Sequence, residues 1–286
     1  MIAGSTKRKI ISYYDDSWFD YHLFWRLGSQ HALHYGFWDN RTHSLSRALR
    51  RENETLAQLA HITHSDHVLD AGCGVGGSSL YLAQTLGCKV TGISLVSSQI
   101  AAATSLAKKL RVDTLTHFKV DDFTGTSFPN NSFDVVWAIE SVCHAPKKED
   151  FLYEAYRLLK PGGRFIVAEY LLRQQPTSSH DQKIIRRWTS GWAIESLDTA
   201  DAFLSKARTA GFADVRLQDF TWAIMPSSRH MYRSRLLTLP FEWITRKLGW
   251  RGKSAKGNFD AARYQYYAFR DNLCQYAVVT ASKPRR

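Results

Sequence analysis

The 286-residue sequence has no apolar run close to the roughly 18 residues that a membrane-spanning helix needs. Its beginning is polar and charged, with Lys7, Arg8 and Lys9, and it has neither the apolar stretch nor the cleavage site of a signal peptide. We therefore expect a cytoplasmic protein in which any contact with a membrane is peripheral.

Cysteine is scarce and scattered, at Cys73, Cys88, Cys143 and Cys274. These positions form no C-x-x-C pair and no Cys/His cluster with the spacing of a metal site. The pattern argues against a disulfide scaffold and against a zinc site. We expect reduced thiols and no bound metal.

Acidic residues are few in the C-terminal part of the chain. The net charge is +12, and residues 226–286 hold 13 Lys and Arg against 3 Asp and Glu, a balance of +10. Three interpretations fit: a solvated basic face, an anionic membrane surface or lipid-like ligand, and nucleic acid. Since no RNA-binding motif is apparent, we expect no nucleic-acid partner and predict peripheral membrane association. A basic nucleic-acid-binding protein is the alternative from another functional class.

Strand and helix patterns alternate along most of the chain, which predicts an α/β fold with a mostly parallel sheet. Predicted strands cover 67–71, 89–93, 115–120, 133–139, 164–171, 215–222 and 275–281, and predicted helices cover 45–59, 76–86, 98–110, 149–159 and 199–210. Residues 1–60 are expected to form an aromatic, helical cap, 61–222 the ligand-binding core, 223–272 a basic, partly helical cap insertion, and 273–286 the final core strand and tail. The short linkers indicate one domain with a lid.

A glycine turn connects the first predicted strand to the next helix, in the segment Val68–Gly77 that contains Asp70, Gly72, Cys73, Gly74 and Gly76. A turn without side chains lets backbone N–H groups approach a ligand, so it alone fits NAD, FAD or no ligand. The glycine spacing differs from the dinucleotide pattern, and the second strand ends in Ser94 instead of the acid that a dinucleotide ribose prefers. Asp70 is placed to hold the amino group of an amino-acid moiety.

Two further strand ends carry polar side chains. Asp122 and Phe123 follow the third predicted strand, where a carboxylate and an apolar ring suit an adenine; the alternative is a loop with exposed acids. Glu140 and His144 follow the fourth, and each suits a general base, a cation stabiliser or a substrate partner. The alternative there is a Glu satisfied by backbone N–H groups and a packed His.

Taken together, the Leu69–Gly77 turn, Asp121 and Asp122, and the Leu159–Gly163 segment resemble the class I S-adenosylmethionine-dependent methyltransferases. The resemblance implies a Rossmann-like fold with a seven-stranded sheet, helices on both faces and an antiparallel last strand. It implies S-adenosylmethionine as donor and S-adenosylhomocysteine as product. The cofactor-binding residues that we expect are Tyr14, Asp70, Gly72, Cys73, Gly74, Gly76, Ser94, Gln99, Asp122, Phe123 and Ile139.

The segment Trp137–Pro146 resembles the sterol C-24 methyltransferases more closely, and the tocopherol and cyclopropane fatty-acid enzymes more loosely. That group implies C-methylation of an alkene in a hydrophobic isoprenoid or sterol-like acceptor through a carbocation, with Glu140 and His144 as catalytic residues. Residues 223–272 depart from the sterol pattern, which favours a terpenoid acceptor over a sterol. Expected substrate-binding residues are Tyr13, Trp18, His34, Tyr35 and Trp38. The alternative is an O- or N-methyltransferase of a small natural product.

Overall fold

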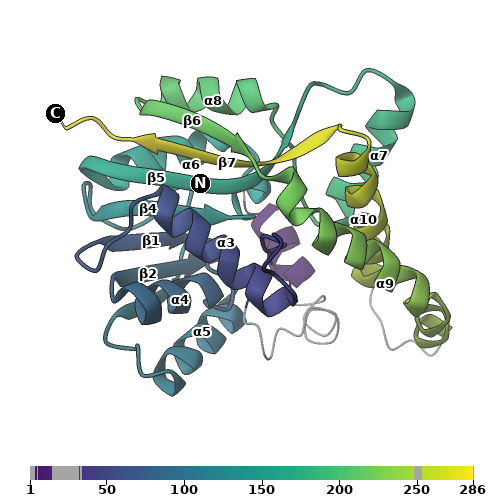
Figure 1. Ribbon diagram of the computed structural model, residues 1–286, viewed down its shortest axis with the longest axis horizontal. Helices are drawn as coiled ribbons and strands as arrows, with labels where there is room; N and C mark the ends of the chain where they lie inside the picture. The colour runs from purple at the N-terminus through teal and green to yellow at the C-terminus, as the bar shows by residue number, and fades with distance from the viewer. Residues whose placement is uncertain (1–3, 5, 15–31, 33, 248–252, 286) are drawn as a thin grey trace.

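A seven-stranded sheet with the strand order β3-β2-β1-β4-β5-β7-β6 forms the centre of the molecule (Figure 1). The computed structural model describes residues 4, 6–14, 32, 34–247 and 253–285, without the side chains of 235–256 and 259. Strands β1 to β5 pair in parallel, and β7 runs antiparallel to both β5 and β6. The strands are β1 (His67–Ala71), β2 (Lys89–Ser94), β3 (Thr116–Val120), β4 (Phe133–Ile139), β5 (Leu159–Leu172), β6 (Ala213–Asp219) and β7 (Cys274–Ser282). The predicted fold, including the antiparallel last strand, is confirmed.

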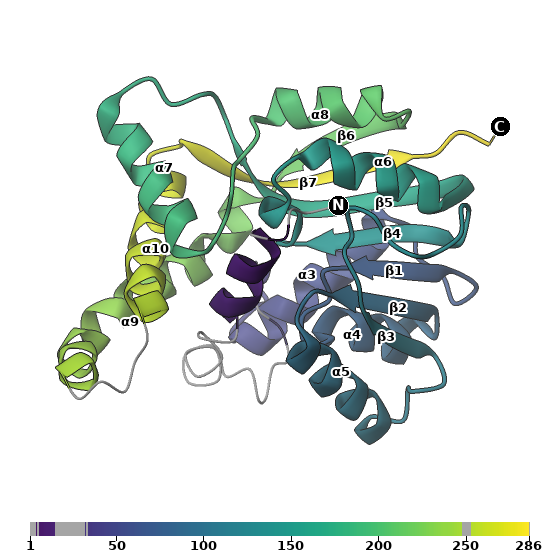
Figure 2. The same cartoon turned by 180° about the vertical axis from the view of Figure 1, so that it is seen from behind.

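Helices cover both faces of the sheet because the apolar side chains of each strand alternate between them (Figures 1 and 2). Val68 and Trp137 belong to the cluster that includes α3 (Leu45–Leu59), α4 (Gly77–Leu86) and α5 (Ser97–Lys109). Leu69 and Val136 belong to the opposite cluster, with α6 (Lys148–Leu158) and α8 (Ala200–Thr209). The two hydrophobic layers hold the carboxyl ends of the parallel strands at one edge.

A helical cap lies beside that edge and consists of residues 6–14, α7 (Ser179–Gly191), α9 (Thr221–Lys247) and α10 (Lys253–Arg270). Helix α10 packs against both α7 and α9. The short 3-10 helix η1 (Val142–His144) follows β4 at the same edge. Segments that are distant in the sequence therefore meet over the ends of the central strands.

The sixth strand begins two residues earlier and ends three residues earlier than the sequence predicts. The strand ends at Asp219. Thr221 and Trp222, which the sequence predicts as the end of the strand, are the first residues of α9. The Asp219 carboxylate accepts hydrogen bonds from the backbone N–H of Thr221 at 2.8 Å and from its hydroxyl at 2.5 Å. This Asx turn leads the chain from the strand into the helix.

The segment Lys160–Gly163 forms a bulge within β5, which begins at Leu159 and not at Arg164. Its pairing with β4 shifts register between Phe133 and Val135, and Gly162 has a φ of 79°. A left-handed glycine absorbs the extra residues of such an irregularity without steric cost.

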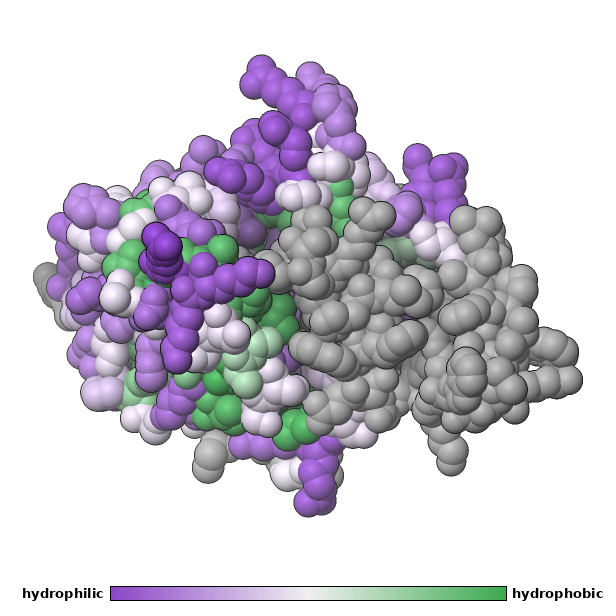
Figure 3. Space-filling model, turned by 90° about the horizontal axis from the view of Figure 1, so that it is seen from below, coloured by the Kyte–Doolittle hydropathy of each residue, from purple (hydrophilic) through white to green (hydrophobic). Residues whose placement is uncertain are grey.

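On the face seen in Figure 3, hydrophilic side chains surround separate patches of apolar ones. Within the described part of the chain, no helix has the length and apolarity that crossing a bilayer would demand.

Helices α7 and α10 cross closely at Gly191 and Gly257. A Cβ added to Gly191 would overlap the carbonyl oxygen of Gly257 and lie 2.8 Å from Cβ of Ala261. Overpacking of this kind costs about 1–3 kcal/mol, so Gly191→Ala should lower the free energy of unfolding by that amount. Denaturant titration checks it, with the exposed neighbour Ser190→Ala as control; equal stability of both variants would contradict the close crossing.

Candidate active site

The turn between β1 and α4 contains three glycines in the left-handed region, with φ of 99° at Gly72, 54° at Gly74 and 89° at Gly76. A Cβ on Gly72 would overlap Cβ of Ser141 and lie 2.9 Å from its Oγ. A Cβ on Gly74 would meet no atom within 4 Å. Gly72 thus permits close packing of the protein, whereas Gly74 borders open space.

That open space is part of a cavity of about 650 Å³ at the carboxyl edge of the sheet. Most of the residues predicted for cofactor, substrate or catalysis line it: Tyr13, Tyr14, His34, Tyr35, Trp38, Asp70, Gly72, Cys73, Gly74, Ser94, Gln99, Phe123, Ile139, Glu140 and His144. Gly76 and Asp122 do not line it, and Trp18 lies outside the described residues. The structure therefore brings together two carboxylates, the glycine turn and a group of aromatic rings.

Gly76 lies on the outer side of the turn. Its Cβ would lie 2.9 Å from Cβ of Ala103 on α5 and 3.2 Å from the Phe118 ring on β3. Because Gly76 has no side chain, α5 and β3 can pack closely against the turn at this position.

Asp70 occupies the carboxyl end of β1 and is buried. The Ser79 hydroxyl donates to its Oδ2 at 2.6 Å. Burial raises the pKa of Asp70 to about 6, against the lowering effect of the Ser79 hydrogen bond and of the nearby His34. A carboxylate with so few donors retains capacity for a cationic ligand group.

Ser94 and Gln99 form a pair on the next strand–helix junction. The Ser94 hydroxyl donates to Oε1 of Gln99 at 2.8 Å and accepts from the backbone N–H of Val96 at 3.2 Å. Both side chains are buried against the cavity. This pair stands where a dinucleotide fold has an acid.

Asp122 is held by protein groups. Its Oδ1 accepts from the Thr124 backbone N–H at 2.9 Å and from the Thr124 hydroxyl at 2.7 Å. Its Oδ2 pairs at 3.0 Å with Nζ of Lys7, in the helical segment 6–14. Asp122 thereby anchors the N-terminal helix beside the cavity, while the adjacent Phe123 lines it.

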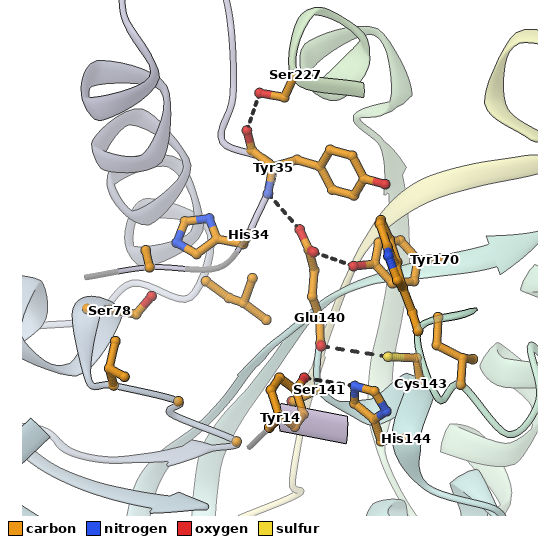
Figure 4. A pocket seen from close by; sticks show the side chains of 18 of the residues that line it. Tyr14, His34, Tyr35, Ser78, Glu140, Ser141, Cys143, His144, Tyr170 and Ser227 are labelled. Atoms are coloured by element: carbon orange, nitrogen blue, oxygen red, sulfur yellow. Dashed lines mark hydrogen bonds between the residues drawn. The ribbon is translucent and has the colours of Figure 1, made fainter. Parts of the chain in front are cut away.

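Glu140 follows β4 in the left-handed region, with a φ of 49° that is uncommon outside glycine and concentrates at functional sites. Its Oε1 accepts from the Tyr35 backbone N–H at 2.9 Å and from the Tyr276 hydroxyl at 3.0 Å. Its Oε2 accepts from the Tyr170 hydroxyl (Figure 4). Burial, and then the negative charge of Glu52, raises the pKa of Glu140 well above its usual value.

His144 lies in η1 with both ring nitrogens engaged. Nδ1 donates to the carbonyl of Ala193 at 3.2 Å, so Nε2, which is 3.0 Å from the Tyr14 hydroxyl, accepts in the neutral ring. Burial lowers the pKa of His144 to about 4. The imidazole is therefore neutral near pH 7 and connects the N-terminal helix to the edge of the sheet.

Several residues around these two groups escape prediction from the sequence. The rings of Tyr170 on β5 and Trp192 after α7 line the cavity beside Tyr35, and their centroids lie 6.4 Å apart. Tyr170 could have been found, since β5 runs parallel to β4 and its carboxyl end reaches the same edge. Trp192 lies in a connecting segment without a distinguishing pattern.

A buried lysine fixes the loop that carries Glu140 and His144. Nζ of Lys148 donates to the carbonyls of Cys143 at 3.0 Å, Ala145 at 2.6 Å and Ser196 at 2.9 Å. The Glu169 carboxylate accepts from the Cys143 backbone N–H at 2.7 Å. Burial raises the pKa of Glu169 to about 7 and lowers that of Lys148. Lys148 and Glu169 thus hold backbone groups of this loop and do not line the cavity, whereas Glu140 and Asp70 do.

Comparison with known proteins gives concordant results. A family model described as a methyltransferase domain matches residues 69–167. The 27-O-demethylrifamycin SV methyltransferase of Amycolatopsis mediterranei is 31% identical over 254 residues, covering 88% of this chain and 90% of that protein. The sterol 24-C-methyltransferase of Saccharomyces cerevisiae is 36% identical over 171 residues, covering 59% of this chain and 45% of that protein.

Among solved structures, the [4+2]-cyclase SpnF superposes with a TM-score of 0.78 at 26% identity, and 97% of each chain is covered. The structural match therefore extends over the sheet and the cap together.

The two glycines should respond differently to substitution. Gly72→Ala should lower the free energy of unfolding by about 1–3 kcal/mol, because the methyl group overlaps Ser141. Gly74→Ala should lower the free energy of unfolding by only about 1 kcal/mol, through backbone strain. It should lower the affinity for S-adenosylhomocysteine, because the added methyl group enters the cavity. Denaturant titration and calorimetry measure both effects. A stable Gly72→Ala, or a Gly74→Ala that binds normally, would refute this division.

The pKa of Asp70 sets an expected pH dependence. A ligand ammonium needs the ionised carboxylate, so S-adenosylhomocysteine affinity should be level above pH 7 and fall about tenfold per pH unit below pH 6. Asp70→Asn should bind more weakly and lose that slope. 5′-Methylthioadenosine, which has no ammonium group, serves as the control ligand in calorimetric titrations. A slope that survives in Asp70→Asn would show that another group titrates.

Proposed function

This chain belongs to the S-adenosylmethionine-dependent methyltransferases, and from that premise we propose that it methylates an alkene carbon of a hydrophobic, isoprenoid-like acceptor. The proposal is based mainly on the aromatic rings around the Glu140 carboxylate. A single carboxylate stands among the cavity-lining rings of Tyr35, Tyr170 and Trp192. Aromatic faces stabilise a developing cation, and a carboxylate removes its proton.

The donor fits the end of the cavity that lies at the glycine turn. The space above Gly74 is open, and the whole cavity is within the range of about 300–1,000 Å³ that small-molecule sites occupy. Asp70 would hold the amino group of the donor, and Ser94, Gln99 and Phe123 would lie along its adenosine. When bound, S-adenosylmethionine supplies a sulfonium methyl group to an electron-rich carbon.

Glu140 is the base in this proposal. As the acceptor gains the methyl group and becomes a carbocation, the Glu140 carboxylate takes a proton from the neighbouring carbon and restores a double bond. The raised pKa makes the ionised carboxylate a stronger base than an exposed one. His144 acts as a neutral hydrogen-bond partner that holds Tyr14 over the cavity.

The relatives support different parts of the proposal. The yeast relative is named for methylation of a sterol carbon, but this chain spans less than half of that protein. The rifamycin relative, which this chain covers almost completely, is named for methylation of an oxygen. O-methylation is therefore the second candidate, and the almost complete coverage of this relative favours it.

The basic residues of 226–286 remain the ground for a predicted association with anionic membranes. Part of this segment reaches the cavity, since Arg229, His230 and Arg233 of α9 line it. An acceptor that is drawn from a lipid layer would enter at this end.

Transfer of a labelled methyl group to fractionated lipid and metabolite extracts, followed by mass analysis of the product, tests the acceptor class. Glu140→Gln keeps the size of the side chain but removes the base, so turnover should fall by about 10²–10⁴ while S-adenosylhomocysteine still binds. Glu149→Gln makes the same change on α6, where Glu149 pairs with Lys206 at 3.1 Å, and should retain turnover. A product methylated on oxygen would favour the second candidate, and full turnover in Glu140→Gln would eliminate Glu140 as the base.

A further inference from the structure

The imidazole of His34 has one nitrogen with a partner and one without. The ring is 7% exposed, and its Nδ1 lies 2.5 Å from Oε2 of Glu52. Its Nε2 is buried and has no hydrogen-bond partner among the described residues. Buried polar atoms are nearly always paired, so an unpaired nitrogen on a side chain that lines the cavity points to a ligand group.

Glu52 fixes how this ring is presented. The carboxylate is fully buried on α3, and it also accepts from the Gly36 backbone N–H at 2.9 Å and from the Tyr276 hydroxyl at 2.6 Å. Because the carboxylate oxygens accept, Nδ1 carries the hydrogen and Nε2 is left facing away from Glu52. In the protonated ring, Glu52 is the counter-ion and Nε2 becomes a second donor.

The unpaired nitrogen is on the side of the glycine turn. His34, Asp70, Gly74 and Ser78 all line the cavity, and Figure 4 shows the His34 ring directed toward Ser78. Ser78 belongs to the first turn of α4, whose N-cap is Gly76 and receives no side-chain hydrogen bond. The start of this ten-residue helix favours a negative charge beside it, because the positive end of the helix dipole lies there.

Asp70 and His34 lie near each other in the cavity wall. Asp70 is an acceptor for a cation, and His34 lies close enough that its charge lowers the pKa of Asp70. An amino acid has a positive and a negative group on one carbon, and these two side chains match them. We propose that the protonated His34 ring, with Glu52 as its counter-ion, donates from Nε2–H to the α-carboxylate of the methyl donor, while Asp70 takes the α-amino group. This proposal rests on the assignment of the glycine-turn end of the cavity to S-adenosylmethionine.

The assignment makes His34 a donor-binding residue, whereas the sequence pattern placed it with the acceptor. It also gives a role to the buried pair that His34 forms with Glu52.

Calorimetric titration with two ligands tests the proposal. S-adenosylhomocysteine has the carboxylate, and 5′-methylthioadenosine keeps the adenosine and the sulfur without the amino-acid part. In His34→Asn the affinity for S-adenosylhomocysteine should fall at least tenfold, while the affinity for 5′-methylthioadenosine should change less than twofold. His180→Ala, on the exposed side of α7, should leave both affinities unchanged.

His34→Gln provides a second variant of similar polarity, and thermal unfolding of every variant reports whether the fold is intact. A parallel loss of both ligands would indicate a purely structural role for His34 and would overturn the proposal, as would unchanged affinity for both. If the wild type bound neither ligand, both the assignment of the cavity to S-adenosylmethionine and the role of His34 would fail. A wild type that binds both ligands confines any failure to the role of His34.

Discussion

The carboxylate of Glu140 is partly buried at the wall of the cavity, and its three hydrogen bonds join distant parts of the chain. The donors are the backbone N–H of Tyr35, before α3, and the hydroxyls of Tyr170 on β5 and Tyr276 on β7. A buried charge without such partners is costly. Placing one carboxylate at the end of β4 therefore requires the N-terminal segment, the middle of the sheet and its last strand to assemble around it.

Glu52 repeats this arrangement on the neighbouring helix, and the hydroxyl of Tyr276 connects the two carboxylates, at 2.6 Å from Glu52 and 3.0 Å from Glu140. The hydroxyl has one hydrogen for two acceptors, and the charge of Glu52 raises the pKa of Glu140. The chemistry of the site is thus set by residues from α3 and β7 that never touch the cavity, together with those that do.

Much of the fold follows from local patterns. The strands that carry Asp70 near the end of β1 and Glu140 just after β4 are short, mostly apolar runs, and their bounds, His67–Ala71 and Phe133–Ile139, agree with the predicted ones. The glycine turn could be located because φ above zero and close approach both demand glycine. The role of Glu52 could not, since a carboxylate at a helical position normally indicates a solvated face. Its burial depends on His34 and Tyr276, whose positions only the tertiary fold determines. The salt bridge between Lys7 and Asp122 is unpredictable for the same reason.

The position of β7 has a consequence for how the chain is made. Strand β6 joins the sheet only through β7, which lies between it and β5. During synthesis on a ribosome, β1 to β5 can pair as they emerge, whereas β6 has no neighbour until residues 274–282 have left the exit tunnel. Tyr276 arrives in that same stretch, so the nascent chain holds Glu140 and Glu52 without their shared hydroxyl. Closure of the sheet and completion of the polar network around Glu140 are therefore one late event.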